Sequence, residues 1–566
     1  MNRAKWTALL LILAILYPVM LSACGGKSAE AITSQPGGGK SATTASATTT
    51  SVGSTSVPTT AAVTTTVKIP ESADLPQTSD APLTSDPPET SDISATPDGT
   101  DLPEPITTEP SVTTTDKPAT TTTKPVTTTP AVTTTTPVSA TTTAKPATTT
   151  VPATSAPATT EPPLPDTSQP PEGDCDRTVL LYEDVKAMWI SQYDMNAIYT
   201  ADGAQREQAD YTALVRSMLD NVKSLGFNTI FLQVRPNADS MYPSDYYPMS
   251  KYVVGAYGRE VSYDPVAIFV EEAHARDLSV HAWINPLRCM KNTEITSVDA
   301  RYKIRQWYDD EDLNGKYIVL YNGTYYLNPA YEEVRQLIAD GAAELLDRYA
   351  FDGLHMDDYF YPTAAASFDA EAYADYLQSG GKSELADFRR AQLDLLVSAL
   401  YSVTKAECEK LLYGISPAGD IEKVYGTQFA DVYKWCASEG YIDYICPQVY
   451  FGFEHATLDF VSVCAAYHEI IKIDSVKLIV GLSFGKAMAG YDDWAGDGKY
   501  EWRDHKDVMK RSLEYTETLE HCVGISVFCY QYFSDPVTGT AVSETAEEVA
   551  NFAPVLREIS WKKENE

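Results

Sequence analysis

Residues 211–235 read YTALVRSMLDNVKSLGFNTIFLQVR and join a helix-like pattern to a strand-like one. In the first part, apolar side chains recur three and four residues apart, as they do on a helix with one buried face. The last part, residues 228–235, is rich in residue types that favour strands. Only residues 225–227 separate the two, so the stretch predicts a helix that turns directly into a strand. The apolar helix positions are Tyr211, Leu214, Val215, Met218, Leu219, Val222 and Leu225.

The same alternation of strand and helix extends in both directions from this stretch. Helical periodicity lies between the strand-like runs, and a second clear example covers residues 334–349. Asn328 and Pro329 are predicted to open that helix as its N-cap and first-turn proline. Eight strand–helix units in series predict an α/β fold of the (β/α)8 TIM-barrel type. The strand-like runs are residues 185–191, 228–235, 278–285, 353–358, 411–416, 444–450, 477–484 and 524–530.

The lengths of the connections agree with a barrel. Helix-to-strand turns are short, as at residues 225–227 and 275–277, whereas the strand-to-helix loops 236–264, 287–328 and 359–384 are long. In (β/α)8 barrels the long loops lie at the C-terminal ends of the strands, where active sites form. A doubly wound sheet is the alternative fold, but it would need fewer strands or a break in the topology, and the pattern shows neither.

Residues 1–23 have the features of a signal peptide. Arg3 and Lys5 give a positive start, an apolar run covers residues 8–16, and small residues precede Cys24. The run is too short to span a bilayer stably. Leu-Ser-Ala-Cys at residues 21–24 resembles the lipobox of bacterial lipoproteins, which predicts that Cys24 becomes a lipidated N-terminus anchored to a membrane. An ordinary secretory signal with a chance cysteine is the alternative.

Residues 24–175 form a Thr/Pro-rich segment that is predicted to be a disordered tether. The segment has almost no aromatic side chains and too little apolar surface to offset the entropy of folding. Its prolines favour extended polyproline II backbone, which makes it a spacer, bare or O-glycosylated. Residues 176–566 have the composition of a globular protein, and we expect them to form one domain outside the cytoplasm, held at the cell surface.

Charge and cysteine content narrow the classes of partner. The formal net charge of −35 discourages contact with nucleic acid, because the phosphates would be repelled. Besides Cys24 the chain has eight cysteines, and none forms a C-x-x-C pair. Several lie in apolar runs, so we expect small buried side chains and assign no disulfide, although export would permit one.

Polar and aromatic side chains gather near the C-terminal ends of five predicted strands. Every second residue of a barrel strand points to the axis, and residues of that parity are polar where a structural core would use Val, Ile or Leu. One such residue is more often a satisfied core polar group, but agreement among five strands indicates a binding site. The positions are Gln233, Arg235, His281, Trp283, Asn285, His355, Asp357, Ser416, Gln448 and Tyr450.

Asp357 is the most informative of these residues. A carboxylate at the end of a barrel strand suits glycosidic chemistry, which needs one carboxylate as nucleophile or base and a second carboxylic acid to protonate the leaving oxygen. Asp358 has the opposite parity, so we expect it at the rim or as a loop cap. Asp358, Asp420, Asp194 and Asp239 follow predicted strands on the same face and are the possible acid partners, each of them more often a cap or surface charge.

The strand-to-helix loops are rich in aromatic side chains, and the whole chain has 36 tyrosines. Aromatic faces suit sugar rings because they present apolar surface with a polar rim. Tyr359 and Tyr361 follow the fourth predicted strand, and we expect both to bind substrate. Ordinary loop packing is the alternative for at least half of the loop aromatics.

Several stretches resemble the glycosyl hydrolase-like 10 family. They are LGFNTIFLQVRP at residues 225–236, HAWINP at 281–286 and FDGLHMDDYFYP at 351–362, followed by SPAG at 416–419 and PQVY at 447–450. The matches occur in the family's order over most of the domain. The resemblance implies a TIM barrel that acts on glycans, with cell-envelope polysaccharide such as peptidoglycan strands as the substrate class.

The fourth strand also resembles the more distant α-amylase superfamily, in which a Gly-x-Arg-x-Asp strand carries the nucleophile. Here the strand reads Gly353-Leu354-His355-Met356-Asp357, with histidine in place of arginine. The resemblance implies a nucleophilic role for Asp357. It assigns no acid, because no glutamate follows the fifth strand in the expected place, and Asp420 there is a weak candidate.

Three functions remain open from the sequence. The first is a cell-surface glycoside hydrolase that needs no cofactor or metal. The second is a non-catalytic glycan-binding lipoprotein whose barrel has lost its acid. The third is a metal-dependent deacetylase using His281, His355 and Asp357, which share one parity but lack the local spacing of known metal motifs.

Overall fold

The computed structural model describes residues 175–562, so the predictions made for residues 1–174 lie outside the described part. Eight parallel strands close into a barrel in the order β1-β11-β10-β9-β8-β7-β3-β2. Each strand falls within or beside one predicted run, so the (β/α)8 prediction is confirmed and the doubly wound alternative is wrong. The bounds are β1 Val185–Ile190, β2 Thr229–Arg235, β3 Ser279–Ile284, β7 Gly353–Met356, β8 Leu412–Ile415, β9 Tyr444–Ile445, β10 Lys477–Ser483 and β11 Cys522–Phe528.

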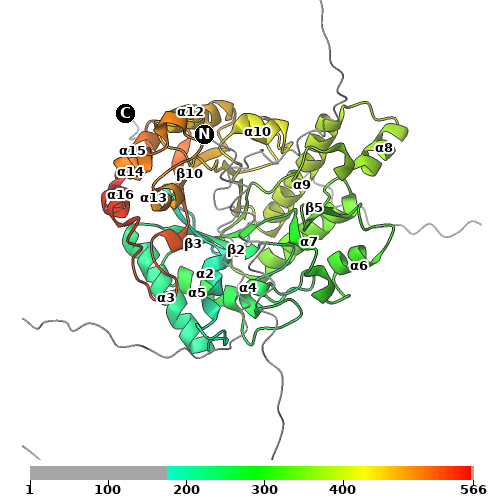
Figure 1. The fold of residues 1–566 in the computed structure, drawn as a ribbon, viewed down its shortest axis with the longest axis horizontal. Coiled ribbons are helices and arrows are strands. Elements are labelled where there is room, and N and C mark those ends of the chain that lie inside the picture. Colours follow the sequence, from blue (N-terminus) through cyan, green and yellow to red (C-terminus); the bar gives the residue numbers. More distant parts are fainter. Residues whose placement is uncertain (1–174, 563–566) are drawn as a thin grey trace, which may run out of the picture. The chain divides into compact units, whose positions relative to one another are not determined.

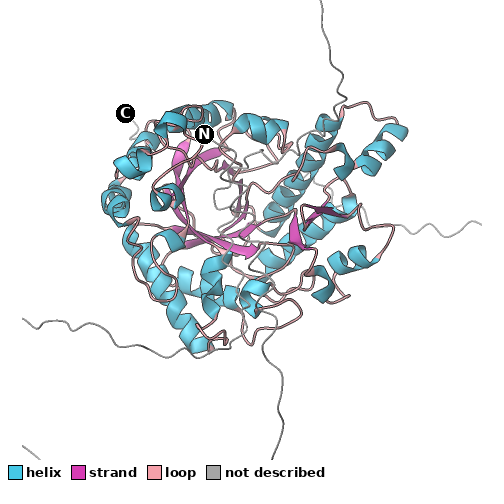
Figure 2. Cartoon of the chain, in the orientation of Figure 1, coloured by secondary structure: helices cyan, strands magenta, loops and turns pink. Residues whose placement is uncertain are grey.

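Helices surround the ring of strands (Figures 1 and 2). The longer ones are α3 (Gln208–Leu225), α5 (Pro265–His274), α7 (Glu332–Arg348), α9 (Leu385–Glu407), α12 (Phe460–Ile470) and α16 (Ala546–Glu558). Shorter helices are α2 (Gln192–Met195), α4 (Lys251–Val254), α6 (Lys303–Asp309), α8 (Ala370–Gln378), α10 (Ile421–Gly426), α11 (Val432–Trp435), α13 (Gly485–Ala489), α14 (Glu501–Asp504) and α15 (Val508–Thr516). Single 3-10 turns are η1 (Asn196–Ile198), η2 (Ile295–Ser297), η3 (Ala366–Phe368), η4 (Gly496–Gly498) and η5 (Tyr530–Tyr532).

The sequence explains where α3 stops. Gly226 follows the helix with a φ of 108°, a left-handed conformation that glycine adopts without steric cost. The predicted start of α7 at Asn328 and Pro329 is wrong. The helix begins at Glu332, because Asn328 accepts a hydrogen bond from the backbone N–H of Ala330 at 3.1 Å and so closes a local turn instead of capping the helix.

A small second sheet lies in the long loop after β3. Its strands are β4 (Arg288–Lys291), β5 (Ile318–Tyr321) and β6 (Thr324–Leu327), in the antiparallel order β4-β6-β5. Figure 2 shows it beside the barrel ring. This sheet was not predicted, and it fixes the first residue of β4 close to the C-terminal ends of the barrel strands.

Aromatic rings fill the interior of the barrel below those ends. His281 and His355 each lie 2.9 Å from the hydroxyl of Tyr444 through Nδ1, and His355 stacks on Phe231 with 4.3 Å between ring centroids. Two glycines make room for these rings. A Cβ at Gly353 would lie 2.8 Å from His281 Nδ1, and a Cβ on the glycine of β8 would overlap the Tyr444 ring. The interior is therefore a packed aromatic layer and not a channel.

The start of the described chain is fastened to the opposite end of the barrel. Cys175 forms a disulfide with Cys408 at the end of α9, a pair that the sequence analysis left unassigned. Arg177 donates to the carbonyl of Leu346 at 2.9 Å and pairs with Glu407 at 3.2 Å. The other six described cysteines are buried thiols, as predicted. Within residues 175–562, no helix is long and apolar enough to cross a membrane.

Candidate active site

A cavity lies where the C-terminal ends of the barrel strands meet. It encloses about 590 Å³, counting the space that opens to solvent. Most of its walls come from residues just inside or just after strands β1, β2, β3, β7, β9 and β11. They are Trp189, Ser191, Gln192, Tyr193, Gln233, Trp283, Arg288, Asp357, Asp358, Tyr359, Gln448, Tyr450 and Phe528.

Asp357 is held in the cavity by N–H donors. Its Oδ2 accepts a hydrogen bond from Trp283 Nε1 at 3.0 Å and a second one from the side-chain amide of Asn285. Its Oδ1 accepts from the backbone N–H of Tyr359 at 3.3 Å. Burial raises the pKa of Asp357 well above its usual value, and the negative charge of Asp358 raises it further, whereas the N–H donors oppose the shift.

Asp358 also lines the cavity, contrary to its expected place at the rim. The strand ends at Met356, so the alternation of side chains that the prediction assumed no longer holds at residue 358. Asp358 is 7% exposed and is hydrogen-bonded by Gln448. Burial raises its pKa to about 6. Two neighbouring buried carboxyl groups disfavour a double negative charge, so the pair holds one proton near neutral pH.

A chain of amides sets the orientation of the donor to Asp357. The backbone N–H of Gln192 donates to Gln233 Oε1 at 2.7 Å, and Gln233 Nε2 donates to Asn285 Oδ1 at 2.9 Å. With its oxygen occupied in this way, Asn285 presents its NH₂ group to Asp357. Gln233 and Asn285 were both predicted as substrate-binding residues, and the structure places them in a network that supports the carboxylate.

Aromatic side chains form the other walls. Trp189 packs edge to face against Trp283, with ring centroids 4.6 Å apart, and its Nε1 donates to Ser526 at 3.0 Å. Tyr450 and Phe528 stack with centroids 6.2 Å apart. Rigid aromatic surfaces beside carboxyl groups suit the apolar faces and hydroxyl edges of a sugar ring.

Two predicted site residues on β3 and β7 do not reach the cavity. His281 and His355 lie in the aromatic layer beneath it, and burial lowers the pKa of His281 to about 4 and that of His355 well below its usual value. Both are therefore neutral side chains that share the Tyr444 hydroxyl. Among residues 175–562, no three His, Cys, Asp or Glu side chains cluster closely enough to hold a metal ion, so the arrangement needed for the deacetylase is not assembled.

Arg235 and Tyr361 lie outside the cavity as well. The pairing of β2 with β3 shifts register between Gln233 and Arg235, and this irregularity reverses the direction of the arginine. Arg235 lies instead over the ring of Tyr247, at 4.7 Å from its centroid. Tyr361 is buried under the guanidinium of Arg389 at 5.3 Å.

The three remaining acid candidates serve as caps and turns. Asp420 is the N-cap of α10 and accepts from the backbone N–H of Lys423 at 3.2 Å. Asp194 accepts from the backbone and side chain of Ser191, and Asp239 accepts from the backbone N–H of Asn237 at 2.8 Å. None of the three lines the cavity, so Asp357 and Asp358 are its two carboxyl groups among the described residues.

Several wall residues were missed by the sequence reasoning. Trp189 and Ser191 have the inward parity on the first strand, which was not searched for polar ends. Arg288 follows the third strand by four residues and depends on the unpredicted sheet for its place. Gln192, Tyr193 and Phe528 carry no comparable pattern, because their positions depend on how the strand ends turn into loops.

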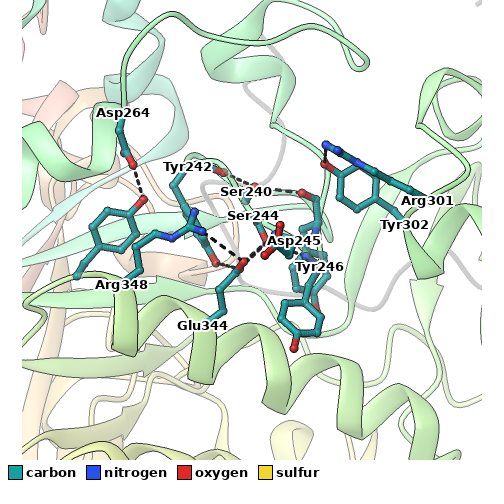
Figure 3. Close-up of polar contacts among 12 residues, drawn as sticks. Ser240, Tyr242, Ser244, Asp245, Tyr246, Asp264, Arg301, Tyr302, Glu344 and Arg348 are labelled. Carbon is teal, nitrogen blue, oxygen red and sulfur yellow. Dashed lines mark hydrogen bonds and ion pairs between the residues drawn. The ribbon is translucent and has the colours of Figure 1, made fainter.

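A second hollow lies to the side of the barrel, between the loops after β2 and β3 and the end of α7. It is larger, at about 1190 Å³ with its open space, and three of its lining residues, Ser244, Asp245 and Arg348, contact Glu344. Glu344 accepts from the Ser244 hydroxyl at 2.6 Å and from the backbone N–H of Asp245 at 2.7 Å, and it lies 3.9 Å from Arg348 (Figure 3). These contacts fasten the loop after β2 to α7.

A closed (β/α)8 barrel with two buried carboxyl groups between aromatic walls at its C-terminal end defines the class of TIM-barrel glycosidases. The chain belongs to the glycosyl hydrolase-like 10 family, whose model matches residues 184–493. It is a glycoside hydrolase.

Curated relatives carry the same description. The glycosyl hydrolase YngK of Bacillus subtilis (strain 168) is 30% identical over 362 residues, which cover 60% of this chain and 68% of the relative. The glycosyl hydrolase DigH of Escherichia coli (strain K12) is 27% identical over 390 residues, covering 63% of this chain and 86% of the relative. Among solved structures, the PgaB (BpsB) glycoside hydrolase domain from Bordetella bronchiseptica aligns at 13% identity with a TM-score of 0.43, over 67% of this chain and 100% of that domain.

Proposed function

We propose that this glycoside hydrolase cleaves glycosidic bonds with Asp357 as the ionised carboxylate and Asp358 as the acid that protonates the leaving oxygen. The observation that carries the assignment is the unequal hydrogen bonding of the pair. Burial and the negative charge of Asp358 together keep the pKa of Asp357 well above its usual value, which favours protonating Asp357 first. Trp283 and Asn285, however, offer it N–H groups that bind a carboxylate, and the backbone N–H of Tyr359 adds a third. The shared proton is therefore assigned to Asp358.

The non-catalytic alternative rested on a missing second carboxyl group. Asp358, which the sequence reasoning placed at the rim, supplies that group inside the cavity. The arrangement then contains both groups that glycosidic hydrolysis needs: a carboxylate to stabilise or attack the sugar centre and a carboxylic acid for the leaving oxygen.

Leaving-group chemistry separates the two roles. On a nitrophenyl glycoside, whose leaving group needs no proton, Asp358→Asn should recover most of the wild-type rate, whereas Asp357→Asn should stay inactive. On an unactivated glycan both variants should be slow. Recovery of Asp357→Asn and not of Asp358→Asn would reverse the assignment.

We propose in addition that the substrate is a cell-envelope polysaccharide, such as peptidoglycan strands, and that the enzyme reaches it from a lipid anchor at Cys24. The signal-peptide pattern, the lipobox-like residues 21–24 and the Thr/Pro-rich composition of residues 24–175 support an exported, tethered enzyme. The disulfide between Cys175 and Cys408 suits an oxidising compartment.

Two experiments test this part of the proposal. Purified peptidoglycan glycan strands should release reducing ends with the full-length protein and not with Asp357→Asn, and Glu344→Gln, outside the cavity, should match the wild type. Cys24→Ala should move the protein from the membrane fraction to the medium or leave an uncleaved precursor. Unchanged membrane anchoring with no lipid on the mature N-terminus would refute the anchor.

A further inference from the structure

Among the described residues that line the cavity, Arg288 is the one cation, and the contacts of its guanidinium leave most of its N–H donors unused. Arg288 is the first residue of β4 and is partly buried. Its Nη1 donates to the hydroxyl of Tyr359 at 2.9 Å, and its Cζ lies 4.8 Å from the centre of that ring. Tyr359 therefore contacts the guanidinium twice: its hydroxyl accepts one hydrogen bond, and its ring covers one face. A guanidinium has five N–H donors, so four remain available.

No carboxylate of the described chain neutralises this cation. Among residues 175–562, no aspartate or glutamate forms an ion pair with Arg288, and the phenols of Tyr193, Tyr252, Tyr326 and Tyr359 are among its polar neighbours. Phenols are uncharged at neutral pH. The positive charge lowers the pKa values of Asp357 and Asp358, but burial, which raises them, is the larger effect in both. The aspartate pair is thus influenced by Arg288 without being its bound counter-ion.

We propose that Arg288 binds a carboxylate on the substrate, so that the enzyme prefers an acidic sugar next to the bond it cleaves. This inference rests on the proposed hydrolysis in the same cavity. The planar guanidinium fork matches a carboxylate in two parallel hydrogen bonds, which a lysine cannot reproduce. A single negative charge suits the site better than a phosphate dianion, because the carboxyl groups of Asp357 and Asp358 line the same cavity and would repel the second charge.

The binding contribution has an expected size. A hydrogen bond to a charged group contributes about 1.5–3 kcal/mol, which corresponds to a change of about 10- to 100-fold in an equilibrium constant. Arg288→Gln should raise KM for an acidic glycan by this factor with a smaller change in kcat. Arg288→Lys should restore only part of the loss, since it keeps the charge and loses the paired geometry.

The test compares glycan strands with free carboxyl groups and the same strands after chemical reduction of the carboxyls to alcohols. The wild-type full-length protein should favour the acidic strands about 10- to 100-fold in kcat/KM, and Arg288→Gln should remove that preference by losing only the acidic substrate. Equal losses on both substrates, with a shifted pH profile, would show that Arg288 acts on the aspartate pair alone and would overturn the proposal.

A binding measurement separates this inference from the proposed hydrolysis. In an Asp357→Asn background, calorimetry should show tighter binding of the acidic strands than of the reduced strands, and adding Arg288→Gln should make the two affinities equal. If neither glycan is hydrolysed by the wild type, the proposed substrate is wrong, yet the binding preference still decides the role of Arg288. Equal affinities before the arginine is changed would contradict it.

Discussion

The cavity at the barrel mouth and the second hollow beside α7 both contain charged side chains, but they differ in how those charges are satisfied. At the wall of the hollow, the Ser244 hydroxyl and the backbone N–H of Asp245 donate to Glu344, which lies near Arg348 (Figure 3). In the cavity, two buried carboxyl groups lie side by side with raised pKa values. A carboxylate that accepts from neighbouring donors, such as Glu344, serves stability, whereas a buried pair of carboxyl groups with raised pKa values is typical of a site where a substrate reacts. Size alone would have selected the wrong hollow.

The largest expected effect that separates the two regions is on turnover. Asp357→Asn keeps the shape of the side chain and removes the charge that meets the sugar centre in the transition state, so kcat should fall about a thousandfold or more. Glu344→Gln should leave kcat unchanged. Thermal unfolding of each variant checks that the fold is intact. Near-wild-type turnover in a well-folded Asp357→Asn would show that the cavity is not the catalytic site.

The second effect is on stability, and it has opposite signs in the two regions. Because burial raises the pKa of Asp358 from 3.8 to about 6, the folded protein keeps this proton to a higher pH than the unfolded chain does. Stability is therefore lost as the pH rises from about 4 through 6, by about 3 kcal/mol in total. Asp358→Asn has no such proton. The free energy of unfolding of this variant, relative to that of the wild type, should therefore be about 3 kcal/mol higher at pH 8 than at pH 4.

Urea unfolding at the two pH values measures this difference. Asp420→Asn is the matched control, because Asp420 is a partly exposed helix cap and its substitution should show no comparable pH-dependent gain. An equal pH dependence of stability in Asp358→Asn and the wild type would mean that folding does not raise the pKa of Asp358.

In the second hollow the corresponding substitution should destabilise. Glu344→Gln weakens an acceptor that holds the Ser244 hydroxyl and the backbone N–H of Asp245. Leaving the part-buried hydroxyl of Ser244 poorly satisfied costs about 1–3 kcal/mol, and the free energy of unfolding should fall by that amount at pH 8. A gain in stability there would contradict the view that this hollow is structural.

The smallest effect concerns the discarded acid candidate. Asp420→Ala removes the N-cap of α10 and should cost about 1 kcal/mol of stability, with no change in kcat. Steady-state kinetics and a melting curve check both parts. A large loss of turnover without loss of stability would return Asp420 to the catalytic residues.

The sequence predicted the barrel because the fold depends on repeated local patterns. Each strand and each buried helix face leaves its own periodicity, as at residues 211–235, and eight such units allow few topologies. Side-chain parity also predicted that Gln233, Trp283, Asn285, Asp357, Gln448 and Tyr450 lie at one site, and the structure has them in the cavity or in its amide network.

Parity failed where the backbone stops being regular. The register shift in β2 turned Arg235 outward, and the end of β7 at Met356 brought Asp358 inward. His281 and His355 kept the correct parity but lie one layer too deep, because periodicity along a strand gives direction and not depth. Arg288 required a sheet built from residues 288–327, a long-range arrangement that no local pattern encodes.

Whether Asp357 and Asp358 share one proton in catalysis is tested by the pH dependence of kcat/KM for the full-length protein on a glycan substrate. If Asp357 and Asp358 share one proton, activity should rise as the first carboxyl group ionises and fall as the second loses its proton, giving a bell-shaped profile. Asp358→Asn should abolish the fall at high pH, because the acid that titrates there is gone. A wild-type profile that stays flat from pH 4 to pH 9, or a high-pH fall that persists in Asp358→Asn, would show that the two aspartates do not share a catalytic proton.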